Sequence, residues 1–146
     1  MEKENQITIA LIDDHQKLRE AVARFFESCN FNVVVQAGHG EMGLNYLQMC
    51  EIVPDVCILD INMPVMDGFA TAKELAKKYP HMKIVVFSSR DDGISVKEML
   101  RLGAKGYLLK GSDPAEIKAA VLKIHKGEYY FSEEVNKVAQ DYLGER

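Results

Sequence analysis

The sequence has few cysteines, and those it has form no disulfide or zinc motif. Cys29, Cys50 and Cys57 are odd in number, lie in apolar surroundings and form no CxxC pair. This pattern favours buried free thiols in a reducing compartment over a disulfide framework. The histidines are also too scattered to form a ligand pair: His15, His39, His81 and His125.

The chain also lacks a membrane-spanning run and an excess of positive charge. No apolar stretch approaches the length that crosses a bilayer, and Met1 to Gln6 is too short and polar for a signal peptide. With 18 basic and 22 acidic residues, the formal net charge is -4, unlike the basic surface of a nucleic-acid reader. We therefore expect a soluble, cytoplasmic protein that engages no membrane and by itself binds DNA poorly.

The chain is long enough for one compact domain, with 146 residues of which 47% are hydrophobic. Apolar runs that suit strands alternate with apolar stripes at helical spacing, which is the pattern of βα repeats and a parallel sheet. Because right-handed crossovers cover both faces of such a sheet, five units predict a three-layer sandwich. The expected strands are 7–12, 31–37, 56–59, 84–87 and 107–109, and the expected helices cover 18–26, 42–51, 69–79, 96–100 and 113–124.

The segment from Glu128 to Arg146 differs in character. An aromatic cluster at 129–131 precedes Ser132, a candidate N-cap, and a sixth amphipathic helix is predicted after it. Two interpretations are open: the helix packs on its own domain, or it serves as a linker to a second domain or as a dimer contact. Its apolar stripe consists of Val135, Val138, Ala139 and Tyr142.

Polar side chains directly follow four of the five expected strands. Because parallel strands end at one edge of a sheet, three carboxylates, a hydroxyl and an ammonium group should share one cleft. Carboxylates this close raise one another's pKa unless a cation lies among them, and Mg²⁺ suits such oxygen ligands. The residues are Asp13 and Asp14, Asp60, Ser88 and Lys110.

Taken singly, most of these residues have an ordinary structural explanation. Asp13 and Asp14 could cap the next helix, and a lone Ser88 or Lys110 would be unremarkable on a surface. Asp60 is harder to explain in this way, because a turn-rich loop separates it from the next helix. Together they favour a divalent-metal and phosphoryl site in which Asp60 is the nucleophile.

Four ordered motifs resemble the receiver domain of two-component response regulators: LIDDH at 11–15, LDINMP at 59–64, FSS at 87–89 and GYLLK at 106–110. The resemblance covers residues 5–126, and 127–146 would be a helical linker toward an output domain outside this chain. It implies a flavodoxin-like (CheY-like) α/β fold with five helices and a five-stranded parallel sheet in the order 2-1-3-4-5.

The same resemblance implies a role for each site residue. Asp60 would accept a phosphoryl group from a histidine kinase, with Mg²⁺ held by Asp13, Asp14, Asp60 and the backbone carbonyl of Asn62. The protein would then be a phosphoacceptor regulator and not an enzyme, apart from self-phosphorylation by small phosphodonors and slow autodephosphorylation.

Ser88 and Lys110 would bind the phosphoryl oxygens, and Tyr107 would be the aromatic switch residue whose rotamer follows Ser88. Two residues depart from the family pattern. Ser89 stands where alanine is usual, which bears on access to Asp60, and Gly111 replaces a proline found in many relatives.

The Asp14-His15 pair, the segment 103–110 and Gly127-Glu128 are similar to the NarL/FixJ subfamily, which usually has a LuxR-type helix-turn-helix output. We therefore expect a transcription regulator that reaches DNA only through that output domain, with a homodimer as a further partner on phosphorylation. One alternative is a stand-alone receiver that docks through its fourth helix, fifth strand and fifth helix. A magnesium-dependent phosphohydrolase is less expected, because Asn62 stands where a second acid would be needed.

Overall fold

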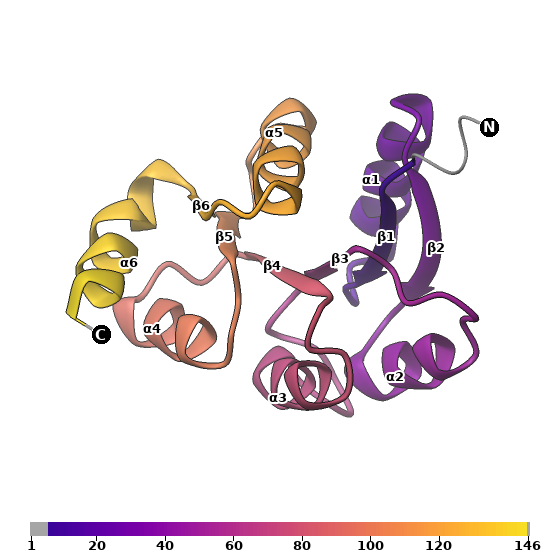
Figure 1. Cartoon of the computed structure of the whole chain (residues 1–146), viewed down its shortest axis with the longest axis horizontal. Helices are drawn as coiled ribbons and strands as arrows, with labels where there is room; N and C mark the ends of the chain where they lie inside the picture. The colour runs from indigo at the N-terminus through magenta and orange to yellow at the C-terminus, as the bar shows by residue number, and fades with distance from the viewer. Residues whose placement is uncertain (1–5, 146) are drawn as a thin grey trace.

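Strands and helices alternate along the chain, as its apolar pattern predicts (Figure 1). The computed structural model describes residues 6–145. Residues 1–5 and 146 lie outside this range. They include most of the segment from Met1 to Gln6 that was judged too short for a signal peptide. They also include residue 5, the first of the predicted receiver, and residue 146, the last of the predicted linker. The elements are β1 (Thr8–Ile12), α1 (Gln16–Ser28), β2 (Asn32–Ala37), α2 (Gly40–Gln48), β3 (Val56–Leu59), α3 (Gly68–Lys78), β4 (Lys83–Ser88), α4 (Gly93–Arg101), β5 (Gly106–Leu109), α5 (Pro114–His125), β6 (Tyr130–Phe131) and α6 (Glu133–Glu145).

The sheet is parallel throughout, with the strand order β2-β1-β3-β4-β5-β6. The predicted flavodoxin-like order of the first five strands is confirmed, but the predicted strand count was wrong by one. The sixth strand, β6, pairs with β5, where Tyr130 N–H donates to Lys105 O and Ser132 N–H donates to Tyr107 O. A strand of two residues is too short to show an alternating pattern, so the sequence carried no strand signal there.

Helices cover both faces of the sheet, so the predicted three-layer sandwich is confirmed. In Figure 1, α1 and α5 lie on one face, and α2, α3 and α4 lie on the other. Each face has its own apolar cluster: Ile9, Phe26 and Ile117 belong to the first, and Ile12, Leu75 and Met99 belong to the second. The central strands are therefore buried on both sides, and their carboxyl ends lie in the middle of one edge of the sheet.

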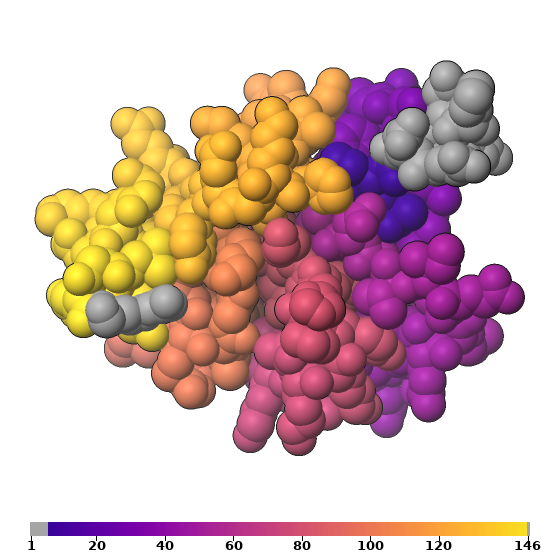
Figure 2. Space-filling model, in the orientation of Figure 1, coloured from indigo at the N-terminus to yellow at the C-terminus, as the bar shows by residue number. Residues whose placement is uncertain are grey.

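The C-terminal segment packs on the rest of the domain. Val135 and Ala139 of α6 are fully buried, and α6 lies against α4. In Figure 2 the yellow C-terminal surface is continuous with the orange surface of the preceding segments. Of the two interpretations of the C-terminal helix, the structure therefore shows packing on its own domain. The division into a receiver at 5–126 and a linker at 127–146 stays a prediction.

Side chains cap the helices near the carboxyl edge of the sheet. Asp67, Asp92 and Asp113 accept a backbone N–H at the start of α3, α4 and α5, respectively. Gly103 follows α4 with φ +108°, the left-handed conformation typical of a glycine that ends a helix. Glu116 in the first turn of α5 accepts a hydrogen bond from the Tyr130 hydroxyl.

The cysteines are free thiols, as predicted. Cys57 is buried, and its burial raises the pKa of the thiol to about 12. Cys29 and Cys50 are only half-buried, although full burial was expected. Within residues 6–145 no helix combines the length and the apolar character needed to cross a membrane.

Candidate functional site

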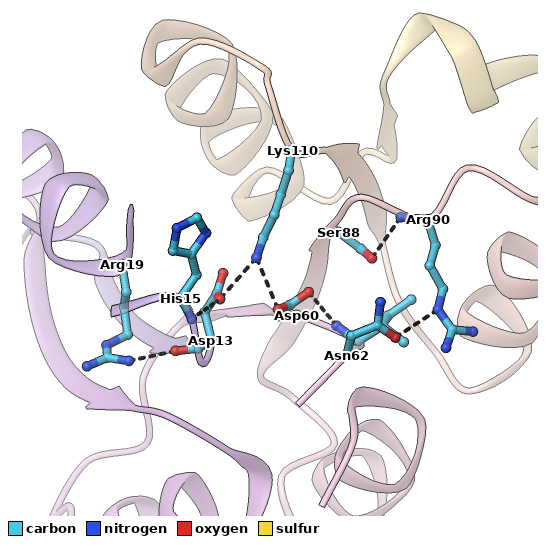
Figure 3. A network of polar contacts seen from close by, with 9 residues as sticks. Asp13, His15, Arg19, Asp60, Asn62, Ser88, Arg90 and Lys110 are labelled. Atoms are coloured by element: carbon cyan, nitrogen blue, oxygen red, sulfur yellow. Dashed lines mark hydrogen bonds and ion pairs between the residues drawn. The ribbon is translucent and has the colours of Figure 1, made fainter. Parts of the chain in front are cut away.

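The residues predicted from the strand ends meet at the carboxyl edge of the sheet (Figure 3). Asp13 follows β1, Asp60 follows β3, Ser88 ends β4 and Lys110 follows β5. The sheet ladder sets their relative positions, because Asp60 N–H donates to Ile12 O over 2.9 Å. The topology therefore joins side chains that are distant in the sequence, which is the arrangement that parallel α/β sheets use for ligands.

Three carboxylates form an acidic cluster in this cleft. Asp13, Asp14 and Asp60 each offer an oxygen, and these oxygens all lie within 4.8 Å of one another. Asp13 and Asp60 are buried, whereas Asp14 is exposed. A set of carboxylate oxygens of which one faces solvent suits a hard divalent cation that keeps some of its water ligands. The cluster could therefore hold a metal ion.

Lys110 is the cation that lies among these carboxylates. Its Nζ donates to Oδ1 of Asp13 over 3.0 Å and to Oδ2 of Asp60 over 3.0 Å. Burial acts to lower the pKa of Lys110, but the two carboxylates outweigh it and hold that pKa above its usual value. The ammonium group is therefore charged at neutral pH and fixed between the two acids.

The environment of Asp60 acts on its pKa in both directions. Burial and the negative charge of Asp13 raise the pKa, whereas Lys110 and the Ile61 N–H lower it, and the net result is a raised pKa. The Ile61 N–H donates to Oδ1 over 2.7 Å, so Oδ1 is tied to the backbone and Oδ2 to Lys110. The orientation of the carboxylate is thereby set by two donors.

Gly68 is a site residue that the sequence reasoning missed. Its N–H donates to Ile61 O over 2.8 Å, and a Cβ at this position would collide with the carbonyl oxygen of Asp60 and lie 2.6 Å from Cα of Ile61. Only glycine lets α3 begin so close to the Asp60 backbone. The sequence indicates only a turn-rich loop between Asp60 and the next helix, although the Asp67-Gly68 pair at the end of that loop could have indicated this close approach.

The two predicted switch residues meet through the backbone of Arg90. Ser88 is fully buried, and its Oγ accepts a hydrogen bond from Arg90 N–H over 3.1 Å. Tyr107 is also fully buried, and its hydroxyl donates to Arg90 O over 2.8 Å. Burial raises the pKa of Tyr107, so its hydroxyl stays protonated as a donor.

Asn62 and Arg90 form the rim of the cleft. Asn62, predicted to supply a backbone carbonyl, is exposed, and its side-chain Oδ1 accepts from Arg90 Nε over 3.0 Å. Arg19 also lies near the site, where its Nη1 donates to Asp13 O over 2.6 Å. Neither arginine belongs to an apolar pattern or a motif of the sequence, so no sequence signal pointed to either one.

The two departures from the usual family pattern have different structural settings. Gly111 has φ +106°, a conformation that proline cannot adopt because its ring fixes φ near −65°. Glycine at this position is therefore required by the path that the chain takes after Lys110. Ser89 is exposed on the loop after β4.

Comparison with known protein families agrees with this geometry. A family model described as response regulator receiver domain matches residues 9–122. The transcriptional regulatory protein DegU of Brevibacillus brevis is 40% identical over 134 residues, which cover 90% of this chain and 56% of DegU. The nitrate/nitrite response regulator NarL of Escherichia coli K12 is 36% identical over 139 residues, which cover 94% of this chain and 63% of NarL. The chain thus spans less than two thirds of the length of these relatives.

Solved structures have the same fold. A LuxR-family two-component response regulator from Aurantimonas sp. SI85-9A1 superposes with a TM-score of 0.84 at 24% identity, over 95% of this chain and 99% of that one. The isolated receiver domain of RcsB from Salmonella enterica serovar Typhimurium superposes with a TM-score of 0.82 at 23% identity, over 92% and 99%. On the match to the family model, the chain belongs to the response regulator receiver domains.

Proposed function

We propose that this chain is the phosphorylation-dependent switch of a two-component system, with Asp60 as the phosphoacceptor. The observation that carries the proposal is the setting of the Asp60 carboxylate: it is buried, oriented by Ile61 N–H and Lys110, and part of an acidic cluster. A histidine kinase is the proposed donor, as is usual for the family to which the chain belongs.

The proposed reaction is the transfer of a phosphoryl group from an imidazole nitrogen to a carboxylate oxygen. An oxygen of Asp60 attacks phosphorus, the P–O bond forms as the P–N bond breaks, and the imidazole leaves with the electron pair of that bond. Lys110 can stabilise the negative charge that develops during the transfer, because its ammonium group already lies 3.0 Å from Oδ2 of Asp60. When bound by Asp13, Asp14, Asp60 and the carbonyl of Asn62, Mg²⁺ would supply positive charge for the phosphoryl oxygens.

The switch would work through hydrogen bonds to the new phosphoryl group. A shift from mostly inactive to mostly active needs about 5 kcal/mol of differential stabilisation. Charge-assisted bonds from Ser88 and Lys110 would each contribute roughly 1.5 to 3 kcal/mol, so their sum reaches the required value only in the upper part of that range. We therefore expect an incomplete switch in this chain alone, with a larger response when a partner surface adds binding energy.

The wider function follows from the relatives and is part of the proposal. DegU and NarL are named as transcriptional or response regulators and are longer than this chain, which supports a cytoplasmic transcription regulator with a helix-turn-helix output. A solved complex contains two RcsB dimers on two parallel DNAs, which supports a homodimer and DNA as partners of the complete protein. The chain would act as a phosphoacceptor and not as a turnover enzyme.

Two observations argue against the alternatives. Part of the face around α4 and β5 that a stand-alone receiver would use for docking is covered by β6 and α6. A phosphohydrolase needs a general acid near Asp60, but Asn62 occupies the relevant position and is bound to Arg90.

Intact-mass analysis after incubation with acetyl phosphate and Mg²⁺ tests the proposal. The wild type is expected to gain one phosphoryl group, and Asp60→Asn is expected to gain none. Asp141→Asn, which alters an exposed carboxylate of α6, is the matched control and should be labelled like the wild type. Equal labelling of the Asp60→Asn variant would remove Asp60 as the acceptor.

A further inference from the structure

Arg90 joins the two predicted switch residues through its backbone. Its N–H donates to Ser88 Oγ over 3.1 Å, and its carbonyl oxygen accepts from the Tyr107 hydroxyl over 2.8 Å (Figure 3 shows the first of these contacts). Ser88 and Tyr107 lie on the neighbouring strands β4 and β5 and are fully buried, whereas Arg90 is exposed. A movement of the loop at Arg90 would therefore reach both side chains.

The side chain of Arg90 anchors that loop to two other parts of the site. Nε donates to Oδ1 of Asn62 over 3.0 Å, and Nη1 donates to Oγ of Ser95 in α4 over 3.4 Å. The guanidinium carbon also lies 5.5 Å from the ring centroid of Phe69 in α3. The planar guanidinium group can make these contacts at once because its donors point in fixed, different directions.

The contact with Ser88 leaves that hydroxyl ready to donate. A serine hydroxyl has one hydrogen and two acceptor lone pairs. Arg90 N–H occupies one lone pair, and the Tyr107 hydroxyl donates its own hydrogen to Arg90 O. Neither backbone bond of Arg90 uses the hydrogen of Ser88, so both bonds can persist when that hydrogen turns toward an oxygen on Asp60.

We propose that Arg90 is a positioning residue that couples the Asp60 loop to α4. Its side chain holds the loop after β4 against Asn62 and Ser95, which keeps Ser88 and Tyr107 in the arrangement that receives a phosphoryl group. The coupling rests on the proposed phosphoacceptor function. A purely structural contact of an exposed arginine would stabilise α4 equally whether or not Asp60 is modified.

Hydrogen exchange of the α4 amides, with and without beryllofluoride and Mg²⁺, tests the coupling. Beryllofluoride stands in for the phosphoryl group, and fluorine NMR reports how much is bound, so variants are compared at equal occupancy. In the wild type we expect bound beryllofluoride to slow exchange in Gly93–Arg101. In Arg90→Ala this slowing should be smaller by about two- to fivefold, the factor that corresponds to one exposed charged contact.

Two further variants make the result specific. Arg101→Ala removes another exposed arginine, one paired with Glu98 inside α4, and should keep the wild-type response. Arg90→Lys keeps the charge without the planar fork and should restore the response only in part.

Three results would overturn the inference: an unchanged response in Arg90→Ala, full restoration by lysine, or an equal change of exchange with and without beryllofluoride. A wild type that binds no beryllofluoride would instead remove the proposed function, and the inference with it.

Discussion

Nζ of Lys110 lies 3.0 Å from Oδ2 of Asp60, although 50 positions separate the two residues in the chain. The same ammonium group donates to Asp13 over 3.0 Å, so it bridges two carboxylates that would otherwise repel each other. Even so, the pKa of Asp60 remains raised, because burial and the charge of Asp13 outweigh Lys110 and the Ile61 N–H. The ionised form of Asp60 therefore costs folding free energy.

We expect Asp60→Asn to be more stable than the wild type at neutral pH in the absence of divalent metal. The folded pKa lies above the unfolded value of about 3.9, so wild-type stability falls as the pH rises from there through the folded pKa. The amide has no charge to bury, and its advantage should be on the order of 1 kcal/mol near pH 7 and vanish near pH 3. Urea unfolding at both pH values measures the difference.

Asp92 provides a control for which stability should change with pH in the opposite direction. Its pKa is lowered chiefly by a hydrogen bond from the Ser95 backbone N–H, so its contribution is present at neutral pH and lost as the pH falls through the folded pKa. Asp92→Ala should therefore be less stable than the wild type near neutral pH, with a smaller difference in acid. An Asp60→Asn variant that is less stable than the wild type at neutral pH would contradict the prediction.

Magnesium affinity should depend on both carboxylates that follow β1. Asp13→Asn and Asp14→Asn are each expected to weaken Mg²⁺ binding by at least about tenfold, because even outer partners of metal sites contribute that much. Titration calorimetry measures the affinity, with Asp141→Asn as a control on the exposed face of α6. Wild-type Mg²⁺ affinity in both variants would mean that Asp13 and Asp14 hold no metal and contribute only to the structure at the start of α1.

Much of this site could be predicted because it lies at strand ends. Apolar runs identify β1, β3, β4 and β5, and parallel pairing brings the polar residues that follow them to one edge. The prediction needed no contact information, because Asp60 and Lys110 each stand directly after a buried run. The meeting of these residues at one edge therefore followed from the pattern, whereas the strand order came from the resemblance to receiver domains.

The missed features depend on local geometry that a pattern does not contain. Two residues are too few to identify β6, which is held by hydrogen bonds to β5 and by packing under α6. Gly68 is required by a close approach of two backbone segments, and Arg90 lies in an irregular loop. Such features arise from tertiary contacts, so they became visible only in the folded chain.

The close approach at Gly68 gives a sharp prediction. Gly68→Ala would push a methyl group against the Asp60 carbonyl and Cα of Ile61, which are backbone atoms that cannot rotate away. We expect a loss of about 1 to 3 kcal/mol in the free energy of unfolding and slower labelling of Asp60 by acetyl phosphate. Urea unfolding and intact-mass time courses measure the two effects.

Gly144→Ala is the matched control for this change. A Cβ at Gly144 would meet no atom within 4 Å, and the residue lies in α6. Alanine there should leave labelling unchanged and raise stability by no more than about 1 kcal/mol, because it favours helix over glycine. Equal changes in the free energy of unfolding at the two positions would show that the close backbone contact at Gly68 does not make alanine destabilising there.

The last prediction concerns Ser132, which attaches the C-terminal segment to β5. Its N–H donates to Tyr107 O over 3.0 Å, and its Oγ accepts from Leu109 N–H over 2.9 Å, at a position that is only 2% exposed. Ser132→Ala removes the second bond and leaves the Leu109 N–H without this acceptor, at a cost of about 1 to 2 kcal/mol in the free energy of unfolding.

Amide exchange should localise this effect. We expect faster exchange in β6 and in the first turn of α6, whereas Ser28→Ala, which alters an exposed hydroxyl of α1, should change stability by less than about 0.5 kcal/mol. Because the backbone of Tyr107 is bonded to the same residue, the loosening should also reach β5. Unchanged exchange in α6 would mean that burial of Val135 and Ala139 alone holds the segment in place.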